Sequence, residues 1–241
     1  MRRSPDQGRA AARGRFMAIR AILFDFDGVI ADTENIHIVA WQRTLSRMGW
    51  LIPDEAAAKA AEVDDRLWLT GLFATKSLVD GDIEGWCALK QELATRLFAE
   101  VDVIYPGVSE LVDRLRGRFR LGVVSTTWRE NVAAVLGRAG LSEAFEFVIA
   151  KEDVVEVKPD PECYRRALSR MGLDASEVIA VEDSPGGLSA AIGAGLATAA
   201  VGHRRPEGEW SAPARWFLPS LRSADRVVNE LGLESAGDRS S

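Results

Sequence analysis

The chain has 241 residues, of which 47% are hydrophobic and 27% are charged, as in an ordinary globular protein of one domain carrying an insertion. Its formal net charge of −6 argues against nucleic acid or an anionic membrane as a partner, because both would favour a basic face. No apolar run approaches the ~20 residues that a membrane-spanning helix needs.

The cysteines and histidines limit the kinds of site that the chain can build. Cys87 and Cys163 lie far apart in no metal-binding spacing, which is typical of free thiols in a reducing compartment and predicts a cytoplasmic protein. His37 and His203 cannot build a histidine metal site by themselves. Any metal must therefore be held mainly by oxygen, which suits Mg²⁺.

The two ends of the chain are set aside from the fold. Residues 1–16 are rich in Arg, Ala and Gly and lack the apolar region of a secretory signal, so we interpret them as a disordered extension. Met17 would serve as a start just before the first predicted strand, and an Arg-rich transit peptide is the alternative. Residues 235–241 are predicted to form a loose tail.

The stretch from Ile19 to Glu34 organises the rest of the chain. Its apolar run at residues 21–24 predicts a fully buried strand, which ends abruptly at Asp25 and Asp27. Ligands bind at the carboxyl ends of strands in open α/β sheets. Two carboxylates this close repel each other unless a cation or a proton holds them together, so the stretch predicts a metal site, an acid/base role, or both.

A helical module follows the first strand. Asp32 or Thr33 is a good N-cap for a helix that ends at Gly49, and residues 53–103 are predicted to be mostly helical. We therefore expect an inserted helical cap at residues 35–103. The core would comprise residues 17–34 together with residues 104–234.

The remaining chain alternates between strands and helices, which predicts an α/β fold with a Rossmann-like parallel sheet and right-handed crossovers. Thr127 and Glu130 match a capping box, so a helix is predicted to begin there with its N–H groups facing the Asp25 edge of the sheet. The predicted strands are residues 120–124, 145–149, 178–181, 197–201 and an edge strand at 215–218. The predicted helices begin near Pro106, Thr127, Pro161, Pro185 and Ala224.

Polar groups follow three of the predicted strands at one edge of the sheet, and one lysine lies in a loop that can reach them. They are Asp25 and Asp27, Ser125 and Thr126, Glu182 and Asp183, and Lys158. The acids would bind Mg²⁺, and the lysine with the helix N–H groups would bind an anion. This combination favours phosphoryl transfer, in which positioning and charge stabilisation do most of the work. Any one of these motifs alone would more often be a turn, a helix cap or a solvated charge.

In this arrangement the sequence resembles the haloacid dehalogenase-like superfamily over almost all of residues 19–205. Its four motifs occur in order, and they are Asp25-Phe26-Asp27-Gly28-Val29, Ser125-Thr126, Lys158-Pro159 and Glu182-Asp183-Ser184. The insert between the first two motifs resembles the small helical cap of subfamily I. The motifs are most similar to the branch of β-phosphoglucomutase, phosphoglycolate phosphatase and the CbbY-type sugar phosphatases.

The resemblance implies a role for each motif residue. Asp25 would be the nucleophile that forms an aspartyl-phosphate, and Asp27 the general acid/base. The transferring phosphoryl group would be held by Ser125, Thr126 and Lys158, and Lys158 would also keep Asp25 ionised. Mg²⁺ would be held by Asp25, the backbone carbonyl of Asp27, Asp183, and Glu182 either directly or through water.

The resemblance also points to residues that would read the substrate. Arg66 and Lys90 resemble cap residues that face the substrate, while Thr33 and His37 match hinge positions of β-phosphoglucomutase. Each has a structural alternative, as an ordinary surface charge or a packing residue. Where the mutase has a lysine for the distal phosphate, this chain has Trp128 followed by Arg129, which would have to substitute.

We therefore expect a Mg²⁺-dependent phosphatase, a monomer or homodimer, acting on a small phosphorylated sugar or sugar acid. The first alternative is a β-phosphoglucomutase-type mutase, which shares the aspartyl-phosphate but passes the phosphoryl group to a sugar hydroxyl. A dehalogenase is disfavoured, because its chemistry needs neither the Asp27 carboxylate nor a Mg²⁺ site. A binding module that kept only the fold would be expected to have lost Asp25, Asp27 or Lys158.

Overall fold

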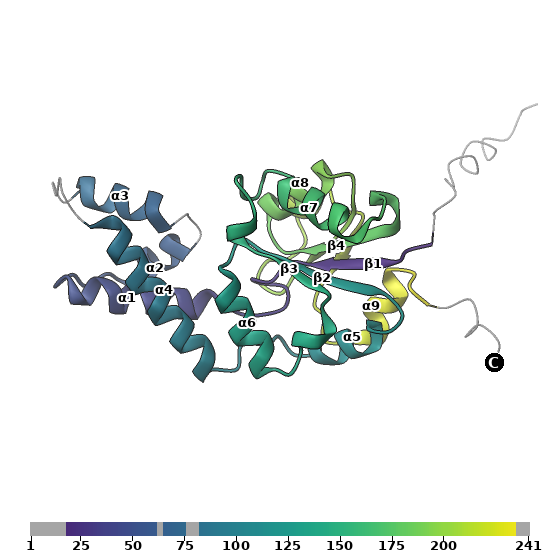
Figure 1. Cartoon of the computed structure of the whole chain (residues 1–241), viewed down its shortest axis with the longest axis horizontal. Coiled ribbons are helices and arrows are strands. Elements are labelled where there is room, and N and C mark those ends of the chain that lie inside the picture. The colour runs from purple at the N-terminus through teal and green to yellow at the C-terminus, as the bar shows by residue number, and fades with distance from the viewer. Residues whose placement is uncertain (1–17, 62–64, 76–81, 235–241) are drawn as a thin grey trace, which may run out of the picture.

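The computed structural model describes residues 18–61, 65–75 and 82–234. The predicted extension at residues 1–16 and the predicted tail at 235–241 lie outside the described residues. Figure 1 shows an α/β body with a group of helices standing to one side of it. Within the described residues, no helix is both long and apolar enough to cross a membrane.

The α/β body is built on a six-stranded sheet in the order β3-β2-β1-β4-β5-β6, with every neighbouring pair parallel. The strands are β1 (Ala21–Phe24), β2 (Arg120–Val124), β3 (Phe147–Ile149), β4 (Val178–Glu182), β5 (Ala197–Val201) and β6 (Trp216–Leu218). The predicted α/β class and parallel sheet are therefore confirmed. Strand β3 is shorter than predicted, because residues 145 and 146 precede the sheet ladder.

Strand β1 is buried on both sides, which explains its uninterrupted apolar sequence. Successive strand side chains point to opposite faces, so Ile22 and Phe24 join one core cluster while Ala21 and Leu23 join the other. Helices α5, α6 and α9 cover one face and helices α7 and α8 the other (Figure 1). Their bounds are α5 (Val108–Leu115), α6 (Arg129–Arg138), α7 (Glu162–Met171), α8 (Pro185–Gly193) and α9 (Ala224–Glu230).

The inserted helices form a cap with a small core of its own, and the described residues of this insert contain no strand. Its helices are α1 (Glu34–Arg47), α2 (Asp54–Ala61), α3 (Asp65–Thr75) and α4 (Ile83–Glu100). Trp41 and Leu45 of α1 belong to this core together with Leu69 and Phe73 of α3. The ring centroids of Trp41 and Trp68 lie 4.7 Å apart. This aromatic packing lets a short segment support a separate hydrophobic core.

Two chain segments join the cap to the core, and they are hydrogen-bonded to each other. The N–H of Asp32 donates to the carbonyl of Val103 at 2.7 Å, and the N–H of Tyr105 donates to the carbonyl of Ile30 at 3.0 Å. Ala31 and Ile104 form an isolated antiparallel bridge between them. The chain therefore leaves the core and returns to it at one place, beside the tip of β1.

Candidate active site

The polar residues that follow β1, β2 and β4 meet at the carboxyl edge of the sheet, because these strands are neighbours in it. Asp25 follows β1, Ser125 follows β2, and Glu182 ends β4 with Asp183 directly after it. Lys158 reaches the same place from the loop before α7. Its Nζ lies 2.6 Å from Oδ1 of Asp25 and 2.7 Å from Oε1 of Glu182.

Lys158 is held by several groups at once. Besides the two carboxylates, its ammonium donates to the carbonyl of Val124 at 2.8 Å and lies 5.3 Å above the ring of Tyr164. Burial lowers the pKa of Lys158, but Asp25 and Glu182 outweigh burial and raise it above its usual value. The hydroxyl of Tyr164 donates to Oε1 of Glu182 at 2.5 Å, which fixes the second carboxylate of the pair. Lys158 is therefore a permanent, well-positioned cation.

Three buried acids form a group that fits a divalent cation. One carboxylate oxygen from each of Asp25, Glu182 and Asp183 lies within 4.8 Å of the others. Oε2 of Glu182 is buried and has no hydrogen-bond partner. An all-oxygen donor set with an unpartnered carboxylate oxygen fits Mg²⁺ better than a softer metal.

The charges of this acidic group are unfavourable without a cation. Burial, with Glu182 and Asp27 adding to it, raises the pKa of Asp25 from 3.8 to about 8. Burial and the nearby Asp25 raise the pKa of Asp183 to about 7. Lys158 lowers the pKa of Asp25, as the sequence predicts, but burial has the larger effect. Lys158 alone is therefore not enough to keep the Asp25 carboxylate ionised at neutral pH.

Two glycines make room for the acids. A Cβ atom on Gly28 would lie 1.9 Å from Oδ2 of Asp183, and a Cβ on Gly187 would lie 1.8 Å from Oε2 of Glu182. Gly28 also has a φ of +81°, which disfavours other residues. The glycine that follows Asp27 is therefore required by both the turn and the neighbouring carboxylate.

Asp27 is fixed by hydroxyl groups from two segments of the chain, the start of α1 and the end of β2. Its Oδ1 accepts from Thr33 at 2.5 Å, and its Oδ2 accepts from Thr127 at 2.7 Å and from Ser125 at 3.2 Å. Thr33 is the N-cap residue of α1, as predicted, but its hydroxyl binds Asp27 and not the helix backbone. This arrangement holds the Asp27 carboxylate at the wall of a cavity that it lines.

The capping box predicted at Thr127 is wrong. Helix α6 begins at Arg129 with Trp128 as its N-cap residue, and no side chain caps it from that position. The Thr127 hydroxyl binds Asp27, a partner 100 residues away in the chain, which the local sequence cannot reveal. Thr127 is thus a residue of the site that the sequence motif misassigned.

The start of α6 is also different from the predicted anion site. The N–H of Arg129 donates to both carboxylate oxygens of Glu152, at 3.1 and 3.2 Å. The Arg129 guanidinium binds the carbonyl of Val148 and pairs with Asp153. Arg129 is absent from the described lining of the cavity beside Asp27, whereas the predicted phosphate-binding residue Thr126 belongs to that lining.

The cavity lies between the cap and the core, and its volume is about 260 Å³. This is slightly below the range of ~300–1,000 Å³ for pockets that bind drug-sized ligands, so a small metabolite fits best. Its described lining comes from both bodies and from the hinge. The lining residues used below are Asp27, Thr33, Glu34, His37, Lys90, Trp128, Lys158 and Arg204.

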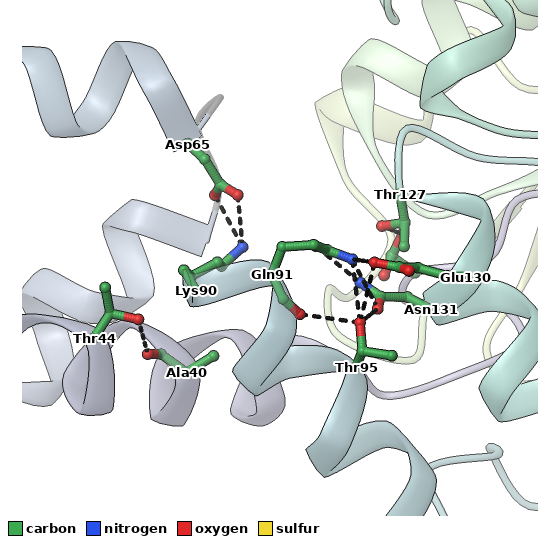
Figure 2. A network of polar contacts seen from close by, with 10 residues as sticks. Ala40, Thr44, Asp65, Lys90, Gln91, Thr95, Thr127, Glu130 and Asn131 are labelled. Atoms are coloured by element: carbon green, nitrogen blue, oxygen red, sulfur yellow. Dashed lines mark hydrogen bonds and ion pairs between the residues drawn. The ribbon is translucent and has the colours of Figure 1, made fainter. Parts of the chain in front are cut away.

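Lys90 and His37 form the cap side of the cavity. Lys90 is buried and donates to both oxygens of Asp65 at 2.9 Å (Figure 2). Its ammonium also lies 5.5 Å from the ring centroid of Trp41. Burial first and Lys90 second lower the pKa of His37 to about 4, so His37 is neutral at pH 7. The His37 ring packs edge-on against Phe98. Both residues therefore face the cavity, but the charge of Lys90 is already matched by Asp65.

Arg66 lies elsewhere. Its guanidinium pairs with Glu84 at 2.7 Å, and both side chains are about two-thirds exposed, at 67% and 69%. It lines a second, wider cavity with Glu84, and it is absent from the described lining of the cavity beside Asp27. Among the predicted cap residues, the structure therefore brings Thr33, His37 and Lys90 to Asp27 but not Arg66.

A polar cluster joins the cap to the core next to the cavity (Figure 2). Asn131 of α6 is fully buried, and its Oδ1 accepts from Thr95 of α4 at 2.7 Å and from Gln91 at 3.0 Å. Glu130 accepts from Gln91 at 3.0 Å as well. These contacts connect the helix that follows Ser125 to the longest helix of the cap.

Two charged residues at the cavity were not identified by the sequence motifs. Glu34 is the first residue of α1, and Arg204 lies in the loop after β5. Nε of Arg204 lies 3.3 Å from Oε2 of Glu34 and 4.0 Å from Oδ2 of Asp183. Because β5 ends at the same sheet edge as β1 and β4, a charged residue directly after it is a signal that sequence reasoning can use.

Known proteins resemble this chain in sequence and in fold. The family described as haloacid dehalogenase-like hydrolase matches residues 22–201. Protein CbbY of Rhodobacter capsulatus is 30% identical over 222 residues, which cover 86% of this chain and 96% of that protein. Pyrophosphatase PpaX of Bacillus velezensis is 33% identical over 190 residues, covering 76% of this chain and 83% of that protein. A crystal structure of a CbbY variant from Rhodobacter sphaeroides in complex with xylulose-1,5-bisphosphate has a TM-score of 0.74 at 30% identity, and the match covers 85% of this chain and 96% of that one.

Proposed function

Because the chain belongs to the haloacid dehalogenase-like hydrolase family, we propose that it is a Mg²⁺-dependent phosphatase that hydrolyses a small phosphorylated sugar or sugar acid. Relatives named as phosphatases or pyrophosphatases support phosphate hydrolysis as the general activity. The CbbY relative in complex with a pentulose bisphosphate supports a small phosphosugar as the substrate.

The observation that carries the proposal is the pairing of two differently held aspartates at one strand tip. Asp25 contacts the Lys158 ammonium at 2.6 Å, whereas the Asp27 carboxylate is held by hydroxyl groups at the cavity wall. The first environment suits a nucleophile beside an anion-binding cation, and the second suits a proton carrier.

In the first half-reaction, an oxygen of Asp25 attacks the phosphorus atom while the bond from phosphorus to the sugar oxygen breaks. Lys158, Ser125 and Thr126 hold the phosphoryl oxygens, and Asp27 gives a proton to the departing sugar oxygen. The free sugar and an aspartyl-phosphate on Asp25 result. Most of the catalysis comes from positioning and from charge stabilisation.

In the second half-reaction, Asp27 takes a proton from a water molecule, which attacks the phosphorus and releases phosphate and free Asp25. Mg²⁺, held by Asp25, Asp183, the backbone carbonyl of Asp27 and Glu182, would offset the negative charges that gather there. The carboxylate group of Asp25, Glu182 and Asp183, with its raised pKa values, supports a need for such a cation.

A phosphosugar mutase is the alternative, since it would share the first half-reaction and differ in the acceptor. Two features weigh against it. Trp128 stands where the mutases have a lysine, and the Arg129 side chain that would have to substitute pairs with Asp153. A cytoplasmic location and a monomeric or homodimeric state stay predictions.

The test is the Asp25→Asn variant, assayed with a panel of phosphosugars and phosphoacids in the presence of Mg²⁺. We expect Asp25→Asn to release phosphate at least ~10³-fold more slowly than the wild type, because the nucleophile is lost while the fold is kept. The panel includes glucose 1-phosphate, and its isomerisation is measured in parallel to detect mutase activity. Wild-type turnover by a folded Asp25→Asn protein would refute the mechanism, and EDTA is expected to silence the wild type.

A further inference from the structure

Arg204 is a cavity residue that the proposed reaction does not use. It follows β5 in a loop outside the recognised motifs, and 24% of its side chain is exposed. Its closest approach to two acids is through Nε, at 3.3 Å from Glu34 and 4.0 Å from Asp183. The contact with Glu34 anchors the guanidinium by one corner at the place where α1 leaves the core.

The two terminal nitrogens of this guanidinium are not taken up by hydrogen bonds within the described protein. Throughout the part of the chain that the structure describes, Nη1 and Nη2 of Arg204 donate no hydrogen bond. Neither nitrogen is among the buried side-chain atoms that lack a hydrogen-bond partner. Since Arg204 lines the cavity, an open fork of N–H donors is available to a ligand there.

Two other cations of the cavity are already occupied. Lys158 is shared between Asp25, Glu182 and the Val124 carbonyl, and both oxygens of Asp65 accept from Lys90. The proposed reaction assigns Lys158 to the transferring phosphoryl group, and the charge of Lys90 is matched by Asp65, so neither lysine is left for a second anion. Arg204 differs from both, because its planar fork retains two parallel donors that match a carboxylate or a phosphate.

We propose that Arg204 binds a second anionic group of the substrate and so makes the enzyme selective for phosphorylated compounds that carry a further phosphate or carboxylate. The inference rests on the proposed phosphatase function and narrows its substrate class. It also moves the anion-reading role away from Arg66, which pairs with Glu84 in another cavity.

The proposal predicts a selective loss of affinity. Arg204→Gln removes the charged fork, and the loss of hydrogen bonds to a charged partner is expected to lower kcat/KM for a doubly anionic substrate by about 10- to 100-fold. The change should appear in KM more than in kcat, because the contact exists before and during the reaction. Arg204→Lys keeps the positive charge but lacks the fork of donors. Its kcat/KM for the doubly anionic substrate should lie between those of the wild type and of Arg204→Gln.

The experiment compares a pentulose bisphosphate with the pentulose monophosphate that lacks its second phosphate. Wild type, Arg204→Gln, Arg204→Lys and Arg66→Gln are assayed on both, with Arg205→Gln as a control for the loss of one positive charge from the same loop. We expect wild type to favour the bisphosphate, and Arg204→Gln to lose that preference because its kcat/KM falls by a larger factor for the bisphosphate than for the monophosphate. An equal loss on both substrates, or a preference that disappears with Arg66→Gln instead, would overturn the proposal.

Binding separates this inference from the proposed function. Titration calorimetry of both compounds is done on the Asp25→Asn protein with and without Arg204→Gln, so that no turnover is required. Tighter binding of the bisphosphate that depends on Arg204 supports the inference even if the wild type hydrolyses neither compound, an outcome that would count against the phosphatase alone. Equal affinity of the two compounds for the Asp25→Asn protein refutes the role of Arg204.

Discussion

At the scale of single residues, a sequence motif predicts some positions of the site, whereas other positions are revealed only by the folded structure. Asp25, Asp27, Lys158, Glu182 and Asp183 follow or precede predictable elements, so their meeting at one sheet edge follows from strand order. Their charge states do not, because the raised pKa of Asp25 comes from burial that a sequence cannot measure.

Thr127 shows why one local motif misled. A threonine followed three residues later by glutamate is compatible with a capping box, and the competing use of its hydroxyl lies 100 residues away at Asp27. The same is true of Thr33, which sits at a helix start but gives its hydroxyl to Asp27. Short polar side chains at strand tips therefore have two possible partners, and tertiary structure decides between them.

Removal of the Thr127 hydroxyl should impair catalysis without unfolding the protein. In Thr127→Val, Asp27 loses a hydrogen bond of 2.7 Å, and we expect kcat to fall by about 10-fold because the carboxylate that we propose as the proton carrier is less well oriented. Thr127→Ser keeps the hydroxyl and should recover most of the rate. Steady-state kinetics and thermal melting of both variants check this, and a Thr127→Val enzyme with the kcat of the wild type would contradict it.

At the scale of elements, the sequence predicted the order of strands and helices well, because buried strands and amphipathic helices have different apolar periods. Strand β3 was predicted two residues too long, since Phe145 and Glu146 continue the strand-like composition without joining the ladder. The contact of α4 with α6 was not predictable, because it depends on how an inserted body docks on its host. Asn131, which anchors that contact, is fully buried although its type is usually exposed.

The polar cluster between α4 and α6 should hold the cap in its docked position. Thr95→Val removes the donor to Asn131 at 2.7 Å (Figure 2), and a loss of about 1 kcal/mol would raise KM by at most about 5-fold by reducing the docked population. Steady-state kinetics measure KM, and small-angle scattering reports the expected increase in the radius of gyration.

Thr44→Val is the matched control for this change. Thr44 is also a buried threonine of the cap, but its hydroxyl binds the carbonyl of Ala40 within α1 at 2.8 Å (Figure 2). Its replacement should affect stability and leave KM near the wild-type value. If both variants raised KM equally, the cluster would have no special role in docking the cap.

At the scale of the whole molecule, we expect stability and metal binding to be linked through the buried acids. Burial, then Asp25, raises the pKa of Asp183 from 3.8 to about 7, and burial raises that of Asp25 from 3.8 to about 8. The folded protein therefore retains protons that the unfolded chain has already released. Without a metal, this contribution to the free energy of unfolding is fully present below the unfolded pKa and is lost as pH rises through the folded values.

The metal-free protein should accordingly melt at a lower temperature near ~pH 8 than near ~pH 6, and each kcal/mol lost corresponds to about 2–4 °C for a chain of this size. Mg²⁺ should raise the melting temperature more at the higher pH, where more of its ligands would be ionised. Calorimetry of the EDTA-treated protein with and without MgCl₂ checks both effects. In Asp183→Asn, the stabilisation by Mg²⁺ should shrink, and a stabilisation independent of pH in the wild type would contradict the linkage.

The paired segments at the hinge have a consequence for how such an enzyme can change. Asp32 and Tyr105 bond across to Val103 and Ile30, so the chain leaves and rejoins the core about one strand spacing apart, roughly 4.8 Å. With respect to the core, the whole cap is then attached in the same way as the loop of a hairpin. A different helical insert with the same two ends can be exchanged without moving Asp25 or Asp27. The fold thereby allows the core, which carries the chemistry, and the cap, which contributes to specificity, to evolve separately. New substrates can then be acquired by replacing the cap.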